Sequence, residues 1–143
     1  MDYEIIQPGK GIEYEWSSDY IFVKTIGNLA DGRVSMVEDT MKPGFHLGRH
    51  RHKQMTEIFY ILEGELTLIF DDETVVASAG TTINIPPNVW HEAKSENGAK
   101  MLSIFSPAGF EDYLAQMKTL TDEQFADEAF MQALNEKYDI WNG

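Results

Sequence analysis

Alternating apolar and polar residues dominate the first three quarters of the chain. Residues 12–16 (IEYEW) place Ile12, Tyr14 and Trp16 between glutamates, and residues 20–26 (YIFVKTI) are rich in β-branched and aromatic side chains. Runs of this kind, each bounded by turn residues, predict about eight short strands. Because no helical period separates them, the pattern predicts a closed barrel or a sandwich.

Turn residues divide this β region. Glu63-Gly64 is expected to separate a strand over residues 57–62 (EIFYIL) from a strand over residues 65–70 (ELTLIF). The last strand is predicted over residues 101–106 (MLSIFS), after a strand-like run at 74–79 (TVVASA). Further turn signals are Asp31-Gly32, Pro43-Gly44, Asp71-Asp72 and Pro86-Pro87-Asn88.

The period of the pattern changes after residue 109 and predicts two short amphipathic helices. Thr121 and Gln124 have the spacing of a capping box at the start of the second helix. We expect the apolar stripes to pack on the barrel or on a partner subunit rather than to bind a ligand. The stripe residues are Phe110, Tyr113, Leu114 and Met117, followed by Phe125, Ala129, Phe130, Ala133 and Leu134.

Length and composition fit one globular domain. The chain has 143 residues, of which 43% are hydrophobic and 12% aromatic, enough for one core and too few for a comfortable second one. We therefore expect a single domain over residues 1–143, with a barrel core at about 1–106 and a helical segment at about 107–143.

Charge and cysteine content exclude several classes of function. The net charge of −13, from 24 acidic and 11 basic residues, repels nucleic acid. The longest apolar run, Ile58–Leu62, is far shorter than the roughly 20 residues of a membrane span, and the N-terminus lacks the bases of a secretory leader. We expect a soluble, cytoplasmic protein. Because cysteine is absent, any metal must be held by nitrogen and oxygen.

His50 and His52 stand one residue apart in a basic, strand-like segment. Residues two apart on a strand point to the same face, which suits two nitrogen ligands of one metal ion. Glu57 begins the next predicted strand, and His91 follows the proline turn, so both could return beside the pair. The alternative is an exposed basic strand with a solvated glutamate, and spacing alone leaves both interpretations open.

The spacing of these residues resembles the two motifs of the cupin superfamily. The first motif reads Gly44, five residues, His50-x-His52, four residues, Glu57, six residues and Gly64. The second reads Gly80, five residues, Pro86, one residue, a turn position, two residues and His91. Asn88 stands at the usual turn glycine and Ser95 at the usual final asparagine, and neither is a ligand position.

The resemblance implies an all-β fold with C-terminal helices, the cupin double-stranded β-helix. It implies one divalent metal ion per chain (Fe, Mn, Ni, Co, Cu or Zn) at the barrel mouth, held by His50, His52, Glu57 and His91. Glu57 would serve as a ligand or as an acid/base group. Small cupins with this ligand set resemble quercetin-dioxygenase-like proteins, as does the SPAGFEDYL segment at residues 106–114.

The resemblance therefore implies a metal-dependent dioxygenase-type enzyme that acts on a small enolisable or phenolic compound. Two other classes stay open. One is a non-redox isomerase, decarboxylase, lyase or cyclase, and the other is a cupin that binds a small molecule without turnover. The absent cysteine argues against a thiol dioxygenase with a Cys–Tyr cross-link.

Strand parity makes expectations for the surroundings of the site. His46 shares the parity of His50, so it points into the same cavity unless Gly48 bends the chain toward the surface. Phe59 and Ile61 share the parity of Glu57 and are expected to form an apolar wall. Trp90 either borders the pocket or is structural.

The opposite parity predicts which side chains face outward. Arg49, Arg51 and Lys53 should point away from the metal, which disfavours a phosphosugar isomerase. Barrels of this type resemble homodimers, and we expect Ile58, Tyr60 and Leu62 to form such an interface.

Overall fold

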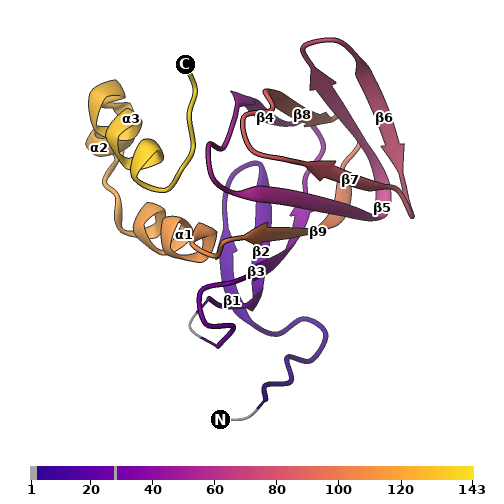
Figure 1. Ribbon diagram of the computed structural model, residues 1–143, viewed down its shortest axis with the longest axis horizontal. Helices are drawn as coiled ribbons and strands as arrows, with labels where there is room; N and C mark the ends of the chain where they lie inside the picture. The colour runs from indigo at the N-terminus through magenta and orange to yellow at the C-terminus, as the bar shows by residue number, and fades with distance from the viewer. Residues whose placement is uncertain (1–2, 28) are drawn as a thin grey trace.

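The computed structural model describes residues 3–27 and 29–143 (Figure 1), so the start of the predicted domain, at Met1 and Asp2, and Asn28 lie outside the described residues. Within them, nine strands precede three helices. The elements are β1 (Ile12–Glu15), β2 (Asp19–Thr25), β3 (Ser35–Met41), β4 (Phe45–His50), β5 (Thr56–Phe70), β6 (Thr74–Ser78), β7 (Thr82–Ile85), β8 (His91–Ser95), β9 (Ala99–Ser106), α1 (Phe110–Thr119), α2 (Asp122–Ala126) and α3 (Glu128–Lys137).

The long strand β5 joins two antiparallel sheets. The first half of β5 pairs with β9 and β7, and this sheet has the strand order β1-β2-β3-β9-β5-β7. The second half of β5 pairs with β6 and β8, and this sheet has the strand order β6-β5-β8-β4. The sheets curl toward each other, and the helices lie to one side of them (Figure 1). The predicted all-β barrel with C-terminal helices is therefore confirmed.

The predicted turn at Glu63-Gly64 is wrong, because β5 runs through it for 15 residues. The pairing with β9 shifts register between Ile61 and Glu63, and Gly64 has φ 74°. A Cβ atom at Gly64 would lie 2.5 Å from the carbonyl oxygen of Gly98. The glycine therefore lets the strand bend from one sheet into the other while β9 passes close by.

Alternation along the strands builds the core. In β5, Phe59, Ile61, Leu66 and Leu68 are at most 1% exposed, and their burial stabilises the fold by roughly 1.5–3 kcal/mol each. Strand β3, which the sequence did not predict, also alternates, and its inward-facing residues are Ser35, Val37, Asp39 and Met41. The acid Asp39 thus shares the inward face of β3 with Val37 and Met41.

The C-terminal region has three helices rather than the predicted two. Asp127 ends α2 and caps α3, because its side chain accepts a hydrogen bond from the backbone N–H of Phe130 at 3.1 Å. The predicted capping box of Thr121 and Gln124 is confirmed. No side chain of α2 or α3, both wholly within the described residues, is buried, and Phe125 is 40% exposed. The second stripe therefore does not pack on the barrel.

Helix α1 does pack on the barrel. Leu114 is buried in a cluster with residues of β1, β2, β3 and β9. Phe110 stacks on Phe105 of β9 with ring centroids 4.4 Å apart. Among the described residues, no helix is long and apolar enough to cross a membrane.

Candidate metal centre

Four side chains from three strands and one loop meet inside the barrel. His50 ends β4, His52 follows it by two residues, Glu57 is the second residue of β5, and His91 begins β8. His50 and His91 are register partners across the β4–β8 pair. All four residues are at most 5% exposed, and one potential ligand atom from each lies within 4.8 Å of the others. The structure thus brings together the four residues that the sequence analysis singled out.

Backbone carbonyls orient the three imidazole rings. In each ring the Nδ1 atom lies close to a backbone carbonyl oxygen. The distances are 2.8 Å for His50 to Gly48, 2.8 Å for His52 to Asp139 and 2.9 Å for His91 to Val89. A carbonyl only accepts hydrogen bonds, so each Nδ1 donates. A neutral ring then presents the lone pair of its Nε2 atom to the centre.

The atoms at the centre fit a cation. Glu57 Oε1 lies 3.2 Å from His91 Nε2 and 3.5 Å from His52 Nε2. The buried Nε2 atom of His52 has no hydrogen-bond partner among the described residues. Lone pairs and a carboxylate facing one another need either an extra proton or a positive ion between them. Three nitrogens and one oxygen are a donor set that a divalent transition metal accepts.

Burial and mutual contacts set the protonation of the cluster. Burial lowers the pKa of His50 to about 4, and the neighbouring His91 acts in the same direction. Burial alone would raise the pKa of Glu57, but the adjoining imidazoles of His52 and His91 outweigh burial and lower this pKa to about 2. Burial alone would lower the pKa of His52, but its contact with Glu57 outweighs burial and raises it. The cluster therefore carries an ionised carboxylate, as metal binding requires.

The C-terminal segment holds His52 in place, and sequence reasoning missed it. Besides the carbonyl that accepts from His52, Asp139 offers a carboxylate that accepts from the backbone N–H groups of Lys53, Gln54 and Met55 at 2.7, 2.9 and 2.8 Å. The indole of Trp141 donates to the same carboxylate at 3.0 Å. Because 87 residues separate Asp139 from His52, no local pattern could have indicated this contact.

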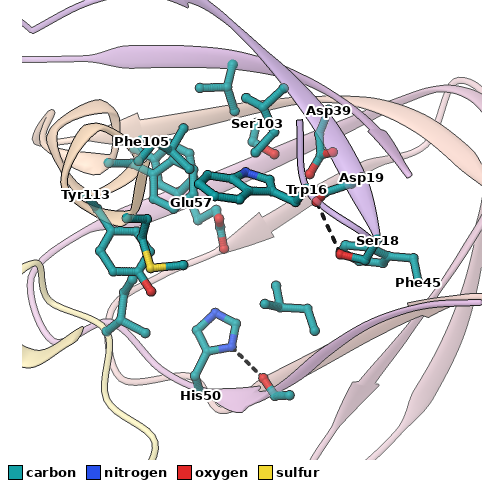
Figure 2. Close-up of a pocket in the computed structure, with 18 of the residues that line it drawn as sticks. Trp16, Ser18, Asp19, Asp39, Phe45, His50, Glu57, Ser103, Phe105 and Tyr113 are labelled. Carbon is teal, nitrogen blue, oxygen red and sulfur yellow. Dashed lines mark hydrogen bonds between the residues drawn. The ribbon is translucent and has the colours of Figure 1, made fainter. Parts of the chain in front are cut away.

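The cluster opens onto a cavity of about 350 Å³, within the range of small-molecule sites. Aromatic and aliphatic side chains form most of its wall, and α1 contributes Tyr113 and Leu114. Figure 2 shows Phe105, Trp16 and Phe45 around the space into which Glu57 points. The cavity therefore suits a small, largely apolar molecule.

The surroundings predicted from strand parity need revision. Phe59 lines the cavity, whereas Ile61 is fully buried in the core and does not. The His46 side chain is 57% exposed at the cavity rim, and its Nε2 atom lies 2.6 Å from Glu92 Oε2. The register of the β4–β8 pair shifts between Leu47 and His50, so simple alternation does not hold between His46 and His50.

Trp90 lies outside the cavity. Its ring has the guanidinium carbons of Arg49 and Arg51 over it at 4.0 and 4.7 Å. Lys53 likewise lies over the ring of Trp141 at 3.5 Å. These three cations thus point away from the metal cluster, as their parity predicted.

Sequence reasoning also missed two acids in the cavity wall. Asp19 on β2 and Asp39 on β3 are each 7% exposed and line the cavity. Ser18 Oγ donates to Asp19 Oδ1 at 3.3 Å, whereas Asp39 Oδ1 has no partner among the residues described. Burial, together with the neighbouring Asp19, raises the pKa of Asp39 to about 10. The alternation Val37-x-Asp39-x-Met41 was the available signal.

Comparison with known proteins gives the family of this fold. A family model described as "Cupin domain" matches residues 37–105. A quercetin 2,3-dioxygenase of Bacillus subtilis is 29% identical over 93 residues, which are 64% of this chain and 27% of that protein. The chain spans between about a quarter and half of the length of the curated relatives it matches.

Solved structures share the fold. KdgF from a Halomonas species matches with a TM-score of 0.68 at 14% identity, covering 76% of this chain and 99% of that one. A predicted oxalate decarboxylase from Thermotoga maritima matches with a TM-score of 0.67 at 16% identity, covering 73% and 99%. At such identities the likeness concerns the fold alone.

Proposed function

The chain belongs to the cupin superfamily, and from that premise we propose that it is a metal-dependent dioxygenase-type enzyme acting on a small enolisable or phenolic compound. The observation that carries the proposal is the convergence of three Nε2 lone pairs and one ionised carboxylate at the wall of a mainly apolar cavity. When bound there, a redox-active divalent ion supplies open coordination positions and Lewis acidity toward an enolate or phenolate.

The residues of the chain would prepare the site in two ways. His50, His52 and His91 would hold the ion with rings already oriented by backbone carbonyls, so little order is lost on binding. Phe105 and Phe110, stacked at 4.4 Å, close one side of the cavity and would exclude water from the bound substrate.

Glu57 would have a double role. Its carboxylate would neutralise one charge of a divalent ion, and its second oxygen would stay available to receive a proton from an acidic hydroxyl of the substrate. With its pKa near 2, the group is ionised at neutral pH, which supports the ligand role and makes it only a weak base.

Oxygen consumption tests the proposal. Protein loaded separately with Fe, Mn, Ni or Co should take up oxygen in the presence of flavonols, 1,3-diketones or catechols. A Glu57→Gln variant should take up much less under the same conditions. Absence of oxygen uptake with every metal and every compound class would contradict the oxygenase proposal.

A second candidate is a non-redox decarboxylase, lyase, isomerase or cyclase. The buried pair of Asp19 and Asp39 favours it, because a protonated carboxyl in the cavity suits proton transfer without oxygen. Turnover by zinc-loaded protein under strict anaerobiosis would support it over the first candidate. Saturable ligand binding without any product would instead indicate a binding protein.

We also propose that the chain forms a homodimer through the outer face of β5. Tyr60 is 42% exposed there, and Ile58 and Leu62 are half-buried, which leaves an apolar strip on the sheet. Light scattering at micromolar concentration should give twice the mass of the 16.3 kDa chain, and Tyr60→Lys should lower it toward the monomer. A monomeric native protein would contradict this part of the proposal.

A further inference from the structure

Asp19 and Asp39 form a polar spot in the cavity that the metal cluster does not use. They occupy inward positions of β2 and β3, whereas the cluster comes from β4, β5, β8 and the loop after β4. Figure 2 shows the two carboxyl groups turned toward each other, with His50 on a different part of the wall. The cavity therefore has a carboxyl site apart from the metal cluster on a largely apolar wall.

The Asp39 side chain has an unused acceptor. Its Oδ1 atom is buried and has no hydrogen-bond partner in the part of the chain that the structure describes. Buried polar side-chain atoms of native proteins usually have a hydrogen-bond partner, which can be protein, water or a ligand. Because Asp39 lines the cavity, a molecule in the cavity can reach this oxygen.

We propose that the Asp19–Asp39 pair binds a hydroxyl group of the cavity's ligand, with Asp39 Oδ1 accepting the hydrogen bond. The inference rests on the proposed function in one respect, namely that oxygen atoms at the other end of the same ligand would face the metal cluster. It narrows the substrate class to compounds that carry a hydroxyl group remote from the metal-binding oxygens.

A neutral hydroxyl fits the pair better than a cation does. Two carboxyls this close hold one proton between them most easily, since two buried like charges repel. A hydroxyl can donate to the free oxygen and leave that proton in place. An ammonium group only donates hydrogen bonds, so it could pair with the free oxygen but could not accept a hydrogen bond from the proton that the carboxyls share.

The shape of the cavity agrees with an aromatic ligand. Trp16 and Phe45 lie in the wall near the pair (Figure 2), and Ile21 and Met101 are the register partners of Asp39 on the neighbouring strands. An aromatic ring placed among them would be held by apolar contact, and the hydrogen bond to Asp39 would fix its orientation.

Carboxyl-carbon NMR with three small probes tests the inference. Protein labelled with ¹³C at the aspartate carboxyl groups is titrated with phenol and with anisole, which has the same ring but no hydrogen to donate. Phenol should shift the signals of Asp19 and Asp39 saturably, and anisole should shift them far less. Equal effects of both probes, or none of phenol, would overturn the proposal.

The third probe, benzylamine, separates a hydroxyl site from a cation site. It should shift the two signals no more than anisole does. A benzylamine effect as large as that of phenol would overturn the assignment to a neutral hydroxyl.

Two variants localise the effect. Asp39→Leu keeps the size of the side chain and removes the acceptor, and should weaken phenol binding at the Asp19 signal about tenfold. Asp39→Asn keeps an oxygen acceptor and a neutral group, and should bind phenol nearly as the native protein does. Asp72→Asn removes an exposed acid and serves as the charge control. Unchanged phenol binding by folded Asp39→Leu would contradict the inference.

The titrations are run on zinc-loaded and on metal-free protein. A phenol effect that persists without metal supports the carboxyl pair even if no oxygenase substrate is found. Conversely, oxygen uptake with a flavonol together with an absent phenol effect would leave the proposed function intact and overturn this inference alone.

Discussion

Two buried carboxyl sites on one cavity wall have opposite protonation states. Glu57 and Asp39 are similarly buried, at 5% and 7% exposure, yet the pKa of Glu57 is lowered to about 2 and that of Asp39 is raised to about 10. Burial by itself would raise the pKa of both groups. The difference comes from the neighbours, since Glu57 meets two imidazoles and Asp39 meets another carboxyl.

Strand β9 lies between the strands that carry the two acids. β9 pairs with β3 on one side and β5 on the other, so that Asp39 stands opposite Met101 and Glu57 opposite Phe105. Both acids thus face the interior from β3 and β5, the two strands that flank β9. The Glu57 site is built to receive a cation, and the Asp39 site is built to remain neutral. A ligand that spans them meets a charge at one end and a hydrogen-bond acceptor at the other.

Metal binding should show the largest difference between variants of Glu57 and variants of Asp39. Glu57→Gln removes the only carboxylate of the cluster and should weaken divalent metal binding at least about 100-fold, the upper end of what losing an outer-shell partner costs. Asp39→Asn should retain one metal ion per chain. Elemental analysis and competition with a chelator measure both. Equal losses in the two variants would show that the sites are not separate.

The dependence of stability on pH should differ in sign between the two acids. Glu57 stabilises metal-free protein above its ordinary pKa of 4.5, and this contribution is lost as pH falls toward about 2. Asp39 remains protonated in the folded state between 3.8 and about 10, whereas the unfolded chain releases that proton. Its contribution therefore lowers stability as pH rises through this window.

Urea unfolding of metal-free native protein and Asp39→Asn isolates the second effect. The variant should gain stability over the native protein by up to about 1.4 kcal/mol for each pH unit between those limits. Because Asp19 and Glu57 act on Asp39, the slope of this difference reports the titration of Asp39 together with its response to these two neighbours. Asp72→Asn should show no such slope. A flat difference for Asp39→Asn would mean that Asp39 is ionised in the folded protein.

The sequence predicted more of the metal centre than of the carboxyl pair, for a physical reason. Spacing of His50, His52, Glu57 and His91 matched two known motifs, and the four residues do meet. The pair depends on β3, whose run Glu38-Asp39-Thr40 is too polar to read as a strand in isolation. Pairing with β2 and β9 overrides that local preference.

The errors in the predicted fold have a similar origin. Gly64 signalled a turn, but its positive φ serves a bend inside the continuous strand β5. Strand parity left two positions open for His46, and the register shift between Leu47 and His50 places it at the exposed rim of the cavity. Local patterns specify which residues alternate, whereas bulges and long-range pairings decide where the alternation is interrupted.

A third carboxylate sharpens the contrast, because Asp139 acts on the cluster only through the backbone around His52. Burial would raise its pKa, but hydrogen bonds from three backbone N–H groups and the Trp141 indole outweigh burial and lower it. Asp139→Ala removes these bonds and loosens the carbonyl that orients His52. Metal affinity should fall about tenfold, as for other outer-shell partners.

Asp127→Ala is the matched control for this last effect. It removes the cap of α3 and should cost about 1 kcal/mol of stability, yet it touches no residue of the cluster. Chelator competition should therefore give native affinity for Asp127→Ala and a weakened one for Asp139→Ala. If both variants lost metal affinity in proportion to their stability, Asp139 would contribute to folding alone, and the orientation of His52 would not depend on the C-terminal segment.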